Sequence, residues 1–209
     1  MTAEPPSYSI RPATSDHAAA IRAIEESSIQ KFSTIPELSH LAQPGTFTPN
    51  SLSGLPAWLS RGKVFLAVNC SASEEAEEEV VGVIATLPKD DSIFIAEISV
   101  LEEHHGKGIG SMLLNAVFEW TRGQSALKGE EVKVSLTCYR DVPWNGPWYQ
   151  KKGFEVIEAE RLGEEHAGKI ELDREVLHVV DGSAGERSVS VSVTEGSGPL
   201  LALGKDELS

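Results

Sequence analysis

The distribution of apolar residues divides the chain into short strand-like runs separated by segments with helical spacing. Runs rich in Val, Ile and Leu, either alternating or continuous in hydrophobicity, are typical of β-strands. They occupy residues 8–11, 63–69, 80–87, 93–101, 132–138, 154–162 and 189–193. The run at 93–101 is almost continuously apolar, which predicts a strand that is covered on both faces.

Apolar residues recur at helical spacing between these runs. The helical segments are expected at residues 15–30, 55–61, 111–120, in a short stretch ending near 153, and at 164–177. Thr14 or Ser15 can cap the first of them, and Gly123 is expected to end the third. The stretch at 34–54, rich in Pro, Ser, Thr and Gly, is expected to be a loop with a short helical piece.

This order of elements predicts an α+β protein with a mixed, mostly antiparallel, seven-stranded sheet flanked by helices. At 209 residues the chain is long enough for one substantial core. We expect a single domain at residues 8–195, between flexible tails at 1–7 and 196–209.

A glycine-rich turn joins the strand at 93–101 to the helix that follows it. Gly106, Gly108 and Gly110 let the backbone approach a ligand closely, and the first amides of the helix then favour an anion such as phosphate. The turn lacks the Lys-Ser or Lys-Thr of a P-loop. It is also one residue short of the dinucleotide-binding pattern G-x-G-x-x-G.

The stretch from Val100 to Gly110, VLEEHHGKGIG, resembles the CoA-binding motif of GNAT acetyltransferases, V-x-P-x-x-R-G-x-G-I-G. It departs from that pattern at Glu102, where Pro is usual, and at His105, where Arg or Gln is usual. In that family the turn holds the pyrophosphate of coenzyme A. The resemblance implies CoA contacts along the strand and turn, at Ile98, Val100, Leu101, His105, Gly106, Lys107, Gly108, Ile109, Gly110 and Ser111.

A second stretch, residues 132–154, resembles the same family independently. Tyr149 to Phe154, YQKKGF, matches its Y-x-x-x-G-F, and RDVPWNGPWY resembles a GNAT subgroup with a Trp-Asn pair before the Tyr. The frequent Asn seven residues before the Tyr is Val142 here, so Asn145 is the nearest substitute for a CoA contact. The resemblance covers about residues 8–193 and implies that the strands at 93–101 and 132–138 splay apart around the thioester.

Acyl transfer to an amine needs a base for the amine proton and an acid for the departing thiolate. The resemblance implies that Tyr149 is the acid and also contacts CoA. Relatives place a base at positions matching Phe94 and Ala96, where neither side chain can act. Glu97 is the nearest acid, although alternation turns it to the opposite face unless a bulge intervenes.

A water chain ending at Glu25, at Glu26 or at a backbone carbonyl is the alternative to Glu97 as the base. In GNAT proteins the segment after the first helix lines the acceptor pocket, so Glu25 and Phe32 are expected to contact the substrate. The sequence has no metal-ligand spacing, because His104 and His105 are adjacent and would diverge, and we expect no metal.

The formal net charge of −14 argues against nucleic acid as a partner and favours a cationic substrate. No apolar run approaches 18 residues, and the first residues are neither basic nor apolar, so neither a membrane span nor a signal peptide is predicted. Cys70 and Cys138 fit buried thiols in a reducing compartment, and we expect a cytoplasmic protein.

These observations predict an acetyl-CoA-dependent N-acetyltransferase that modifies an amine, by preference that of a small molecule. The alternative is a non-catalytic protein that binds acyl-CoA as a sensor or scaffold, because His105 replaces the usual Arg and the usual base is missing. The sequence leaves room for a homodimer.

Overall fold

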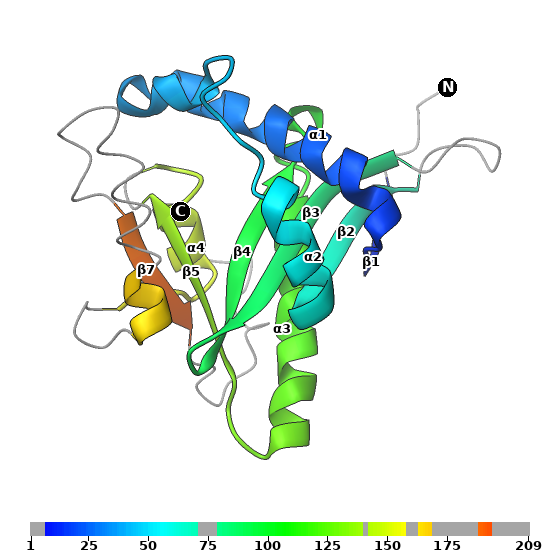
Figure 1. Cartoon of the computed structure of the whole chain (residues 1–209), viewed down its shortest axis with the longest axis vertical. Coiled ribbons are helices and arrows are strands. Elements are labelled where there is room, and N and C mark those ends of the chain that lie inside the picture. The colour runs from blue at the N-terminus through cyan, green and yellow to red at the C-terminus, as the bar shows by residue number, and fades with distance from the viewer. Residues whose placement is uncertain (1–6, 71–78, 140–141, 158–162, 169–187, 194–209) are drawn as a thin grey trace, which may run out of the picture.

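The computed structural model describes residues 7–70, 79–139, 142–157, 163–168 and 188–193, and its centre is one mixed sheet (Figure 1). The strands follow the order β1-β2-β3-β4-β5-β7-β6 across it. Their bounds are Tyr8–Pro12 (β1), Lys63–Asn69 (β2), Glu79–Lys89 (β3), Ser92–Val100 (β4), Lys133–Tyr139 (β5), Glu155–Val156 (β6) and Ser188–Val193 (β7). The expected α+β class and mixed sheet are confirmed.

The pairing of β4 with β5 sets the position of the site. All other neighbouring strands pair in antiparallel fashion, whereas β4 and β5 run parallel. Their paired register begins at Ser92 opposite Lys133 and ends at Ile95 opposite Leu136. Both strands continue past that point, towards the glycine turn on β4 and towards Tyr139 on β5.

Helices cover both faces of the sheet (Figure 1). Their bounds are Ser15–His17 (η1), Ala18–Ser28 (α1), Ile29–Thr34 (η2), Pro36–Ala42 (η3), Ser51–Arg61 (α2), Glu102–His104 (η4), Ile109–Lys128 (α3) and Gly146–Lys151 (α4), and residues 164–168 are also helical. The first predicted helix is therefore a short 3₁₀ turn, α1 and a second 3₁₀ segment in succession. The short helical piece expected within 34–54 is η3.

Two helix ends differ from the sequence prediction for identifiable reasons. Helix α2 begins at Ser51 instead of residue 55, because the Glu25 carboxylate accepts hydrogen bonds from the Ser51 N–H and hydroxyl and so caps it. Helix α3 runs through Gly123 and ends at Lys128; Gly129 caps it, with a φ of 71° that supplies the left-handed conformation of a helix C-terminus. An exposed glycine inside a long amphipathic helix costs too little to stop it.

The C-terminal part of the prediction is only partly described. β6 consists of Glu155–Val156, two residues, where a strand across 154–162 was expected. Residues 158–162 of that run, most of the predicted helix at 164–177, and the predicted tails, apart from Ser7, lie outside the described residues.

The sheet separates two apolar clusters. On one face, α3 packs Leu113, Leu114 and Val117 against the sheet, together with Tyr149 and Phe154. On the other face, α1 and α2 cover strands β2 and β3, with side chains that include Ile21, Ile24, Leu55 and Trp58. The first half of β4, residues 92–95, is fully buried as its apolar run predicted, whereas residues 96–98 are half-buried.

A buried polar network attaches the helical residues 164–168 to the start of β4 and β5. The His166 ring bonds to the Asp90 carboxylate through Nδ1 and to the Ser135 hydroxyl through Nε2, at 2.8 Å in the latter case. The Ser135 hydroxyl lies 2.7 Å from that of Ser92. Ser135 and His166 are 3% and 5% exposed, so a substrate cannot reach this Asp-His-Ser arrangement. Its hydrogen bonds instead stabilise the packing of residues 164–168 against the sheet.

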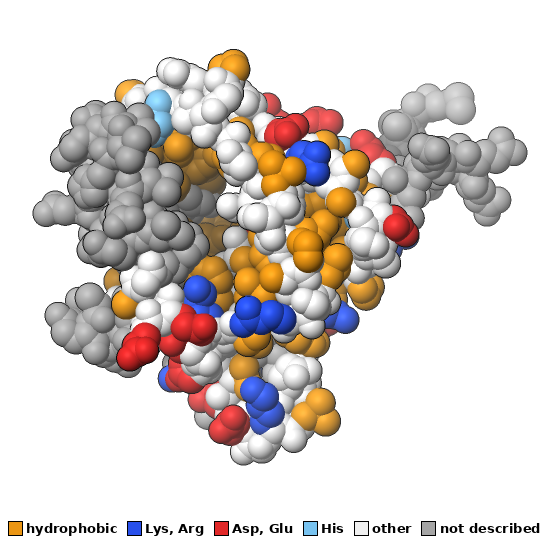
Figure 2. Space-filling view, viewed as in Figure 1, with side chains coloured by type: hydrophobic (Ala, Val, Ile, Leu, Met, Phe, Trp, Pro, Cys, Tyr) orange, Lys and Arg blue, Asp and Glu red, His pale blue; other side chains and the backbone are white. Residues whose placement is uncertain are grey.

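The described surface mixes acidic and basic side chains. On the face shown in Figure 2 they are interspersed, without a broad basic patch among the described residues of that face. None of the helices in the described ranges combines the length and apolar character required to cross a bilayer. Both cysteines are free thiols, and Cys70 is exposed, which corrects its predicted burial: it lies just beyond the end of β2.

Candidate active site

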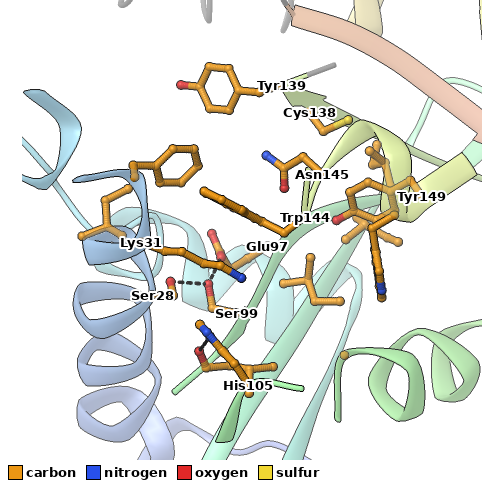
Figure 3. Close-up of a pocket in the computed structure, with 18 of the residues that line it drawn as sticks. Ser28, Lys31, Glu97, Ser99, His105, Cys138, Tyr139, Trp144, Asn145 and Tyr149 are labelled. Atoms are coloured by element: carbon orange, nitrogen blue, oxygen red, sulfur yellow. Dashed lines mark hydrogen bonds between the residues drawn. The ribbon is translucent and has the colours of Figure 1, made fainter. Parts of the chain in front are cut away.

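A cavity of about 730 Å³ opens where β4 and β5 continue past their shared register (Figure 3). Its walls come from six segments of the chain: the end of α1 with η2, η3 with the loop before α2, β4 from Phe94 onwards, the glycine turn, the end of β5, and α4 with the loop before it. Its size is typical of a pocket for a small ligand.

The glycine turn forms one end of the cavity. Gly106 and Gly108 have φ values of 75° and 81°, and a Cβ on either would meet no atom within 4 Å, so both are required by backbone conformation and border open space. Gly108 is the N-cap of the twenty-residue helix α3, whose first amides lack intrahelical partners. Of the residues predicted to contact CoA in this turn, Gly106, Gly108, Ile109, Gly110 and Ser111 line the cavity, whereas Lys107 is exposed and lies outside the lining.

His105 fills the position where the related motif has Arg or Gln. Its Nε2–H donates a 2.8 Å hydrogen bond to the carbonyl of Val100, the last residue of β4. The ring therefore braces the turn against the strand that precedes it, in addition to lining the cavity.

At alternate residues beyond Ile95, the backbone N–H groups of β4 point away from β3 and towards the cavity. The Leu101 N–H bonds to the Val81 carbonyl on the β3 side, at 2.9 Å. Because backbone groups alternate in direction along a strand, the Ile98 and Val100 N–H groups point to the opposite side, where pairing with β5 has ended. Leu101 was predicted to contact CoA, but its N–H is occupied and its side chain packs against both apolar clusters outside the cavity lining.

Glu97 faces the cavity because β4 contains a bulge, the condition on which its predicted role depended. Ala85 pairs with Glu97 and Thr86 with Ile95, so Ala96 is an extra residue on β4 and shifts the alternation by one position. Glu97 accepts hydrogen bonds from Ser99 Oγ at 2.6 Å and from Asn50 Nδ2 at 2.9 Å. A 2.9 Å bond between the hydroxyls of Ser99 and Ser28 links this group to α1 (Figure 3).

Tyr149 lies on the opposite wall from Glu97, on α4, and is 5% exposed. Its ring packs edge-to-face against Trp148 and Phe154, with centroids 4.8 and 5.4 Å away. Burial raises the pKa of the Tyr149 phenol, and the nearby charges of Cys138 and Glu97 add to the rise. The phenol therefore keeps its proton at neutral pH. Asn145, the N-cap of α4, also lines the cavity.

An aromatic group closes the end of the cavity away from the glycine turn. Phe32 packs edge-to-face against Tyr139 and Trp144, with ring centroids 5.5 and 5.8 Å apart. Lys31, on the same 3₁₀ segment as Phe32, places Nζ 4.5 Å from the centre of the Trp144 ring. Burial lowers the pKa of Lys31, which the charge of Glu102 partly opposes. Phe32 was predicted at the site; Lys31 and Trp144 were not.

Glu25 lies near the site without lining the cavity. It is 1% exposed and accepts hydrogen bonds from both the N–H and the hydroxyl of Ser51. Burial raises the pKa of Glu25 to about 7; the charge of Glu97 also raises it, whereas the bonds from Ser51 and Asn50 lower it. Glu25 therefore lies behind Asn50, whose side chain donates to Glu97, and its contact with the substrate stays a prediction.

The described residues contain no group of three or more His, Cys, Asp or Glu side chains placed to hold a metal ion. The site residues that sequence reasoning missed, Lys31, Asn50 and Trp144, come from irregular segments whose course no periodicity reveals. For Trp144 a signal existed, since it is part of the Trp-Asn pair quoted from the second motif.

Residues 62–156 match the family model of the acetyltransferase (GNAT) domain. These 95 residues, a little under half of the chain, are similar to a GNAT acetyltransferase domain. The range matched to the GNAT domain starts just before β2, ends with β6, and includes the glycine turn, Glu97 and Tyr149. Lys31 and Phe32 precede it, so part of the aromatic end of the cavity is built by residues outside the match.

Solved structures of GNAT proteins share the fold. A GNAT-family acetyltransferase from Staphylococcus aureus Mu50 has 13% identity and a TM-score of 0.60, over 90% of this chain and 99% of that one. The ribosomal-protein-S18-alanine N-acetyltransferase of Escherichia coli has 11% identity and a TM-score of 0.56, over 97% and 99%. The PaiA N-acetyltransferase of Thermoplasma acidophilum, solved with coenzyme A, has 12% identity and a TM-score of 0.55, over 90% and 99%.

Proposed function

We propose that this protein is an acetyl-CoA-dependent N-acetyltransferase that transfers the acetyl group directly to the amine of a small molecule. The observation that carries the proposal is the convergence in one cavity of the glycine turn, the Tyr149 phenol and the Glu97 carboxylate. Anion binding, a proton donor and a proton acceptor are the three functions that this reaction needs from the protein.

The binding of acetyl-CoA is supported by the backbone on both sides of the turn. The unpaired amides at the start of α3 suit the pyrophosphate, since Gly106 and Gly108 leave open space there. The Ile98 and Val100 N–H groups suit the amide-bearing pantetheine arm and the thioester oxygen. This arrangement requires β4 and β5 to diverge beyond Ile95 and Leu136, where their register ends.

Acetyl-CoA supplies an activated acetyl thioester, and the residues on the two walls manage the protons. The amine nitrogen bonds to the thioester carbon as the carbon–sulfur bond breaks. Glu97, directly or through a water molecule, receives the proton that the amine loses. Tyr149 gives its proton to the departing sulfur, which leaves as a free thiol, and regains one from solvent.

The fold alone does not identify the acceptor, because one scaffold serves many substrates. Two similar structures are named for different reactions. One acetylates an alanine of ribosomal protein S18, and the other, from Neisseria gonorrhoeae, is an N-acetylglutamate synthase. A cavity bounded by η2, η3 and the loop before α4 favours a small molecule. Membership of the Trp-Asn subgroup, a cytoplasmic location, the lack of nucleic-acid or membrane partners and a homodimer stay predictions.

The test is release of free CoA thiol from acetyl-CoA, measured with a thiol reagent over a panel of amines. Cys70 and Cys138 are free thiols, so each trace is corrected with enzyme that lacks acceptor. Amine-dependent release, with the acetylated amine found by mass spectrometry, is the expected result. Tight binding of acetyl-CoA without amine-dependent release would replace the proposal with the alternative, a non-catalytic acyl-CoA sensor.

A further inference from the structure

The walls of the cavity that face away from the glycine turn carry two opposite charges and a group of aromatic rings. Resting on the N-acetyltransferase function proposed above, we infer that the acceptor is an amino acid: an amine that also bears a carboxylate, with an apolar or aromatic side chain. Glu97 receives the amine, Lys31 the carboxylate, and the rings around Phe32 the side chain.

The position of Lys31 is the first support for a carboxylate. Its ammonium group lies in the cavity wall, over Trp144, and forms no ion pair with any residue that the structure describes (Figure 3). Burial disfavours its charge and so lowers the pKa of Lys31. A carboxylate on the ligand would offset that cost, whereas a second cationic group would add to it.

The distribution of acidic groups argues against a polyamine. Among the described residues that line the cavity, Glu97 alone carries a carboxylate, and Asn50 and Ser99 already hold it in place. A chain with several ammonium groups would need several acidic contacts and would also lie beside Lys31. One carboxylate and one ammonium group in the same pocket instead match a zwitterion.

The aromatic group sets the third part of the ligand. Phe32, Tyr139 and Trp144 come from three segments and pack edge-to-face, which leaves ring faces and edges towards the cavity. Leu41, from η3, and Phe47, from the loop before α2, add apolar surface. A large apolar or aromatic side chain would displace water from this surface, and a short polar one would not.

The test compares amino acids with the same molecules lacking the carboxylate. Thiol release is measured for L-phenylalanine, L-tryptophan and L-leucine and for their decarboxylated partners phenethylamine, tryptamine and isoamylamine. L-serine tests whether the side chain must be apolar, and spermidine tests whether a polyamine is accepted. We expect kcat/KM to be roughly 10- to 100-fold higher for an apolar amino acid than for its decarboxylated partner, the scale of a hydrogen bond to a charged group.

Variants of Lys31 then assign the preference to this side chain. Lys31→Met should remove the preference by lowering kcat/KM for the amino acid alone, and Lys31→Arg should retain it. Lys63→Met is the matched control, because Lys63 also lies over an aromatic ring, Phe65, at 5.9 Å, yet outside the cavity. Lys63→Met should leave kcat/KM unchanged for both the amino acid and its decarboxylated partner.

The outcomes separate this inference from the function on which it rests. Turnover of the decarboxylated amines or of spermidine at least as fast as of the amino acids would overturn the inference and leave an N-acetyltransferase. Acetyl-CoA binding without turnover of any of these compounds would also overturn it as stated. Lack of acetyl-CoA binding would instead remove the proposed function itself.

Discussion

Replacing Glu25 with Gln should change how the stability of the protein depends on pH. Glu25 is buried at the junction of α1 and α2, where the only charged neighbour that affects its titration among the described residues is Glu97. Ser51 donates to both of its carboxylate oxygens, but these bonds do not compensate for the loss of water. The outcome is a pKa of about 7 for Glu25, compared with an ordinary value of 4.5.

The sign and size of the effect follow from proton linkage. Because the folded state binds this proton more tightly than the unfolded state, Glu25 contributes its full stability below pH 4.5, and that contribution is lost as the pH rises through 7. Each tenfold change in proton affinity is worth about 1.4 kcal/mol, so the total is about 3 kcal/mol and the part lost between pH 5.5 and 8 is about 2 kcal/mol. Glutamine carries no charge and lacks this pH dependence.

Urea unfolding monitored by tryptophan fluorescence, repeated from pH 5.5 to pH 8, measures the difference directly. The free energy of unfolding of Glu25→Gln should rise relative to the wild type by about 2 kcal/mol across this range. Glu26→Gln, an exposed neighbour on the same helix, is the control and should follow the wild type. Curves for Glu25→Gln and wild type that stay parallel at all pH values would refute the reasoning.

Three further predictions, made with four substitutions, test the site and the fold. Tyr149→Phe keeps the ring packing but removes the proton donor, so kcat for thiol release should fall roughly 100-fold with little change in KM for acetyl-CoA; an unaltered kcat would exclude Tyr149 as the acid. Gly108→Ala forces a side chain into a φ of 81°, so it should lower the free energy of unfolding by about 1–2 kcal/mol and weaken CoA binding in calorimetry. Gly123→Ala, inside α3, should instead raise the free energy of unfolding by about 0.5–1 kcal/mol. Equal effects of the two substitutions would contradict the assigned turn. His166→Ala leaves the Asp90 carboxylate without its ring partner and should lower the unfolding free energy by roughly 2–4 kcal/mol, and a change within 0.5 kcal/mol would show that the network is not stabilising.

Features fixed by local chemistry were predictable from the sequence. The strand at Lys63–Asn69 has the predicted bounds, because its alternation and the glycine before it are local signals. The glycine turn was located by its spacing alone, and the helix that follows begins within two residues of the predicted start. Tyr149 was placed by the motif around it and lies in the cavity as expected.

Features that depend on tertiary contacts were not predictable. The bulge at Ala96 moves Glu97 into the cavity, and nothing in the local sequence of β4 marks it; it exists only in the register with β3. The early start of α2 depends on a carboxylate 26 residues away in the chain. Lys31 and Asn50 reach the site through 3₁₀ and loop segments, for which periodicity carries no information.

The central claim, that this cavity binds acetyl-CoA, is tested most directly by thermal unfolding with acetyl-CoA, ATP or NAD. At a concentration 100-fold above Kd, a specific ligand adds about 2.7 kcal/mol of stability, which for a domain of this size raises Tm by roughly 5–10 °C. We predict such a shift with acetyl-CoA and not with ATP or NAD. An unchanged Tm with acetyl-CoA, or a larger shift with ATP or NAD, would contradict the assignment of the glycine turn and the mechanism built on it.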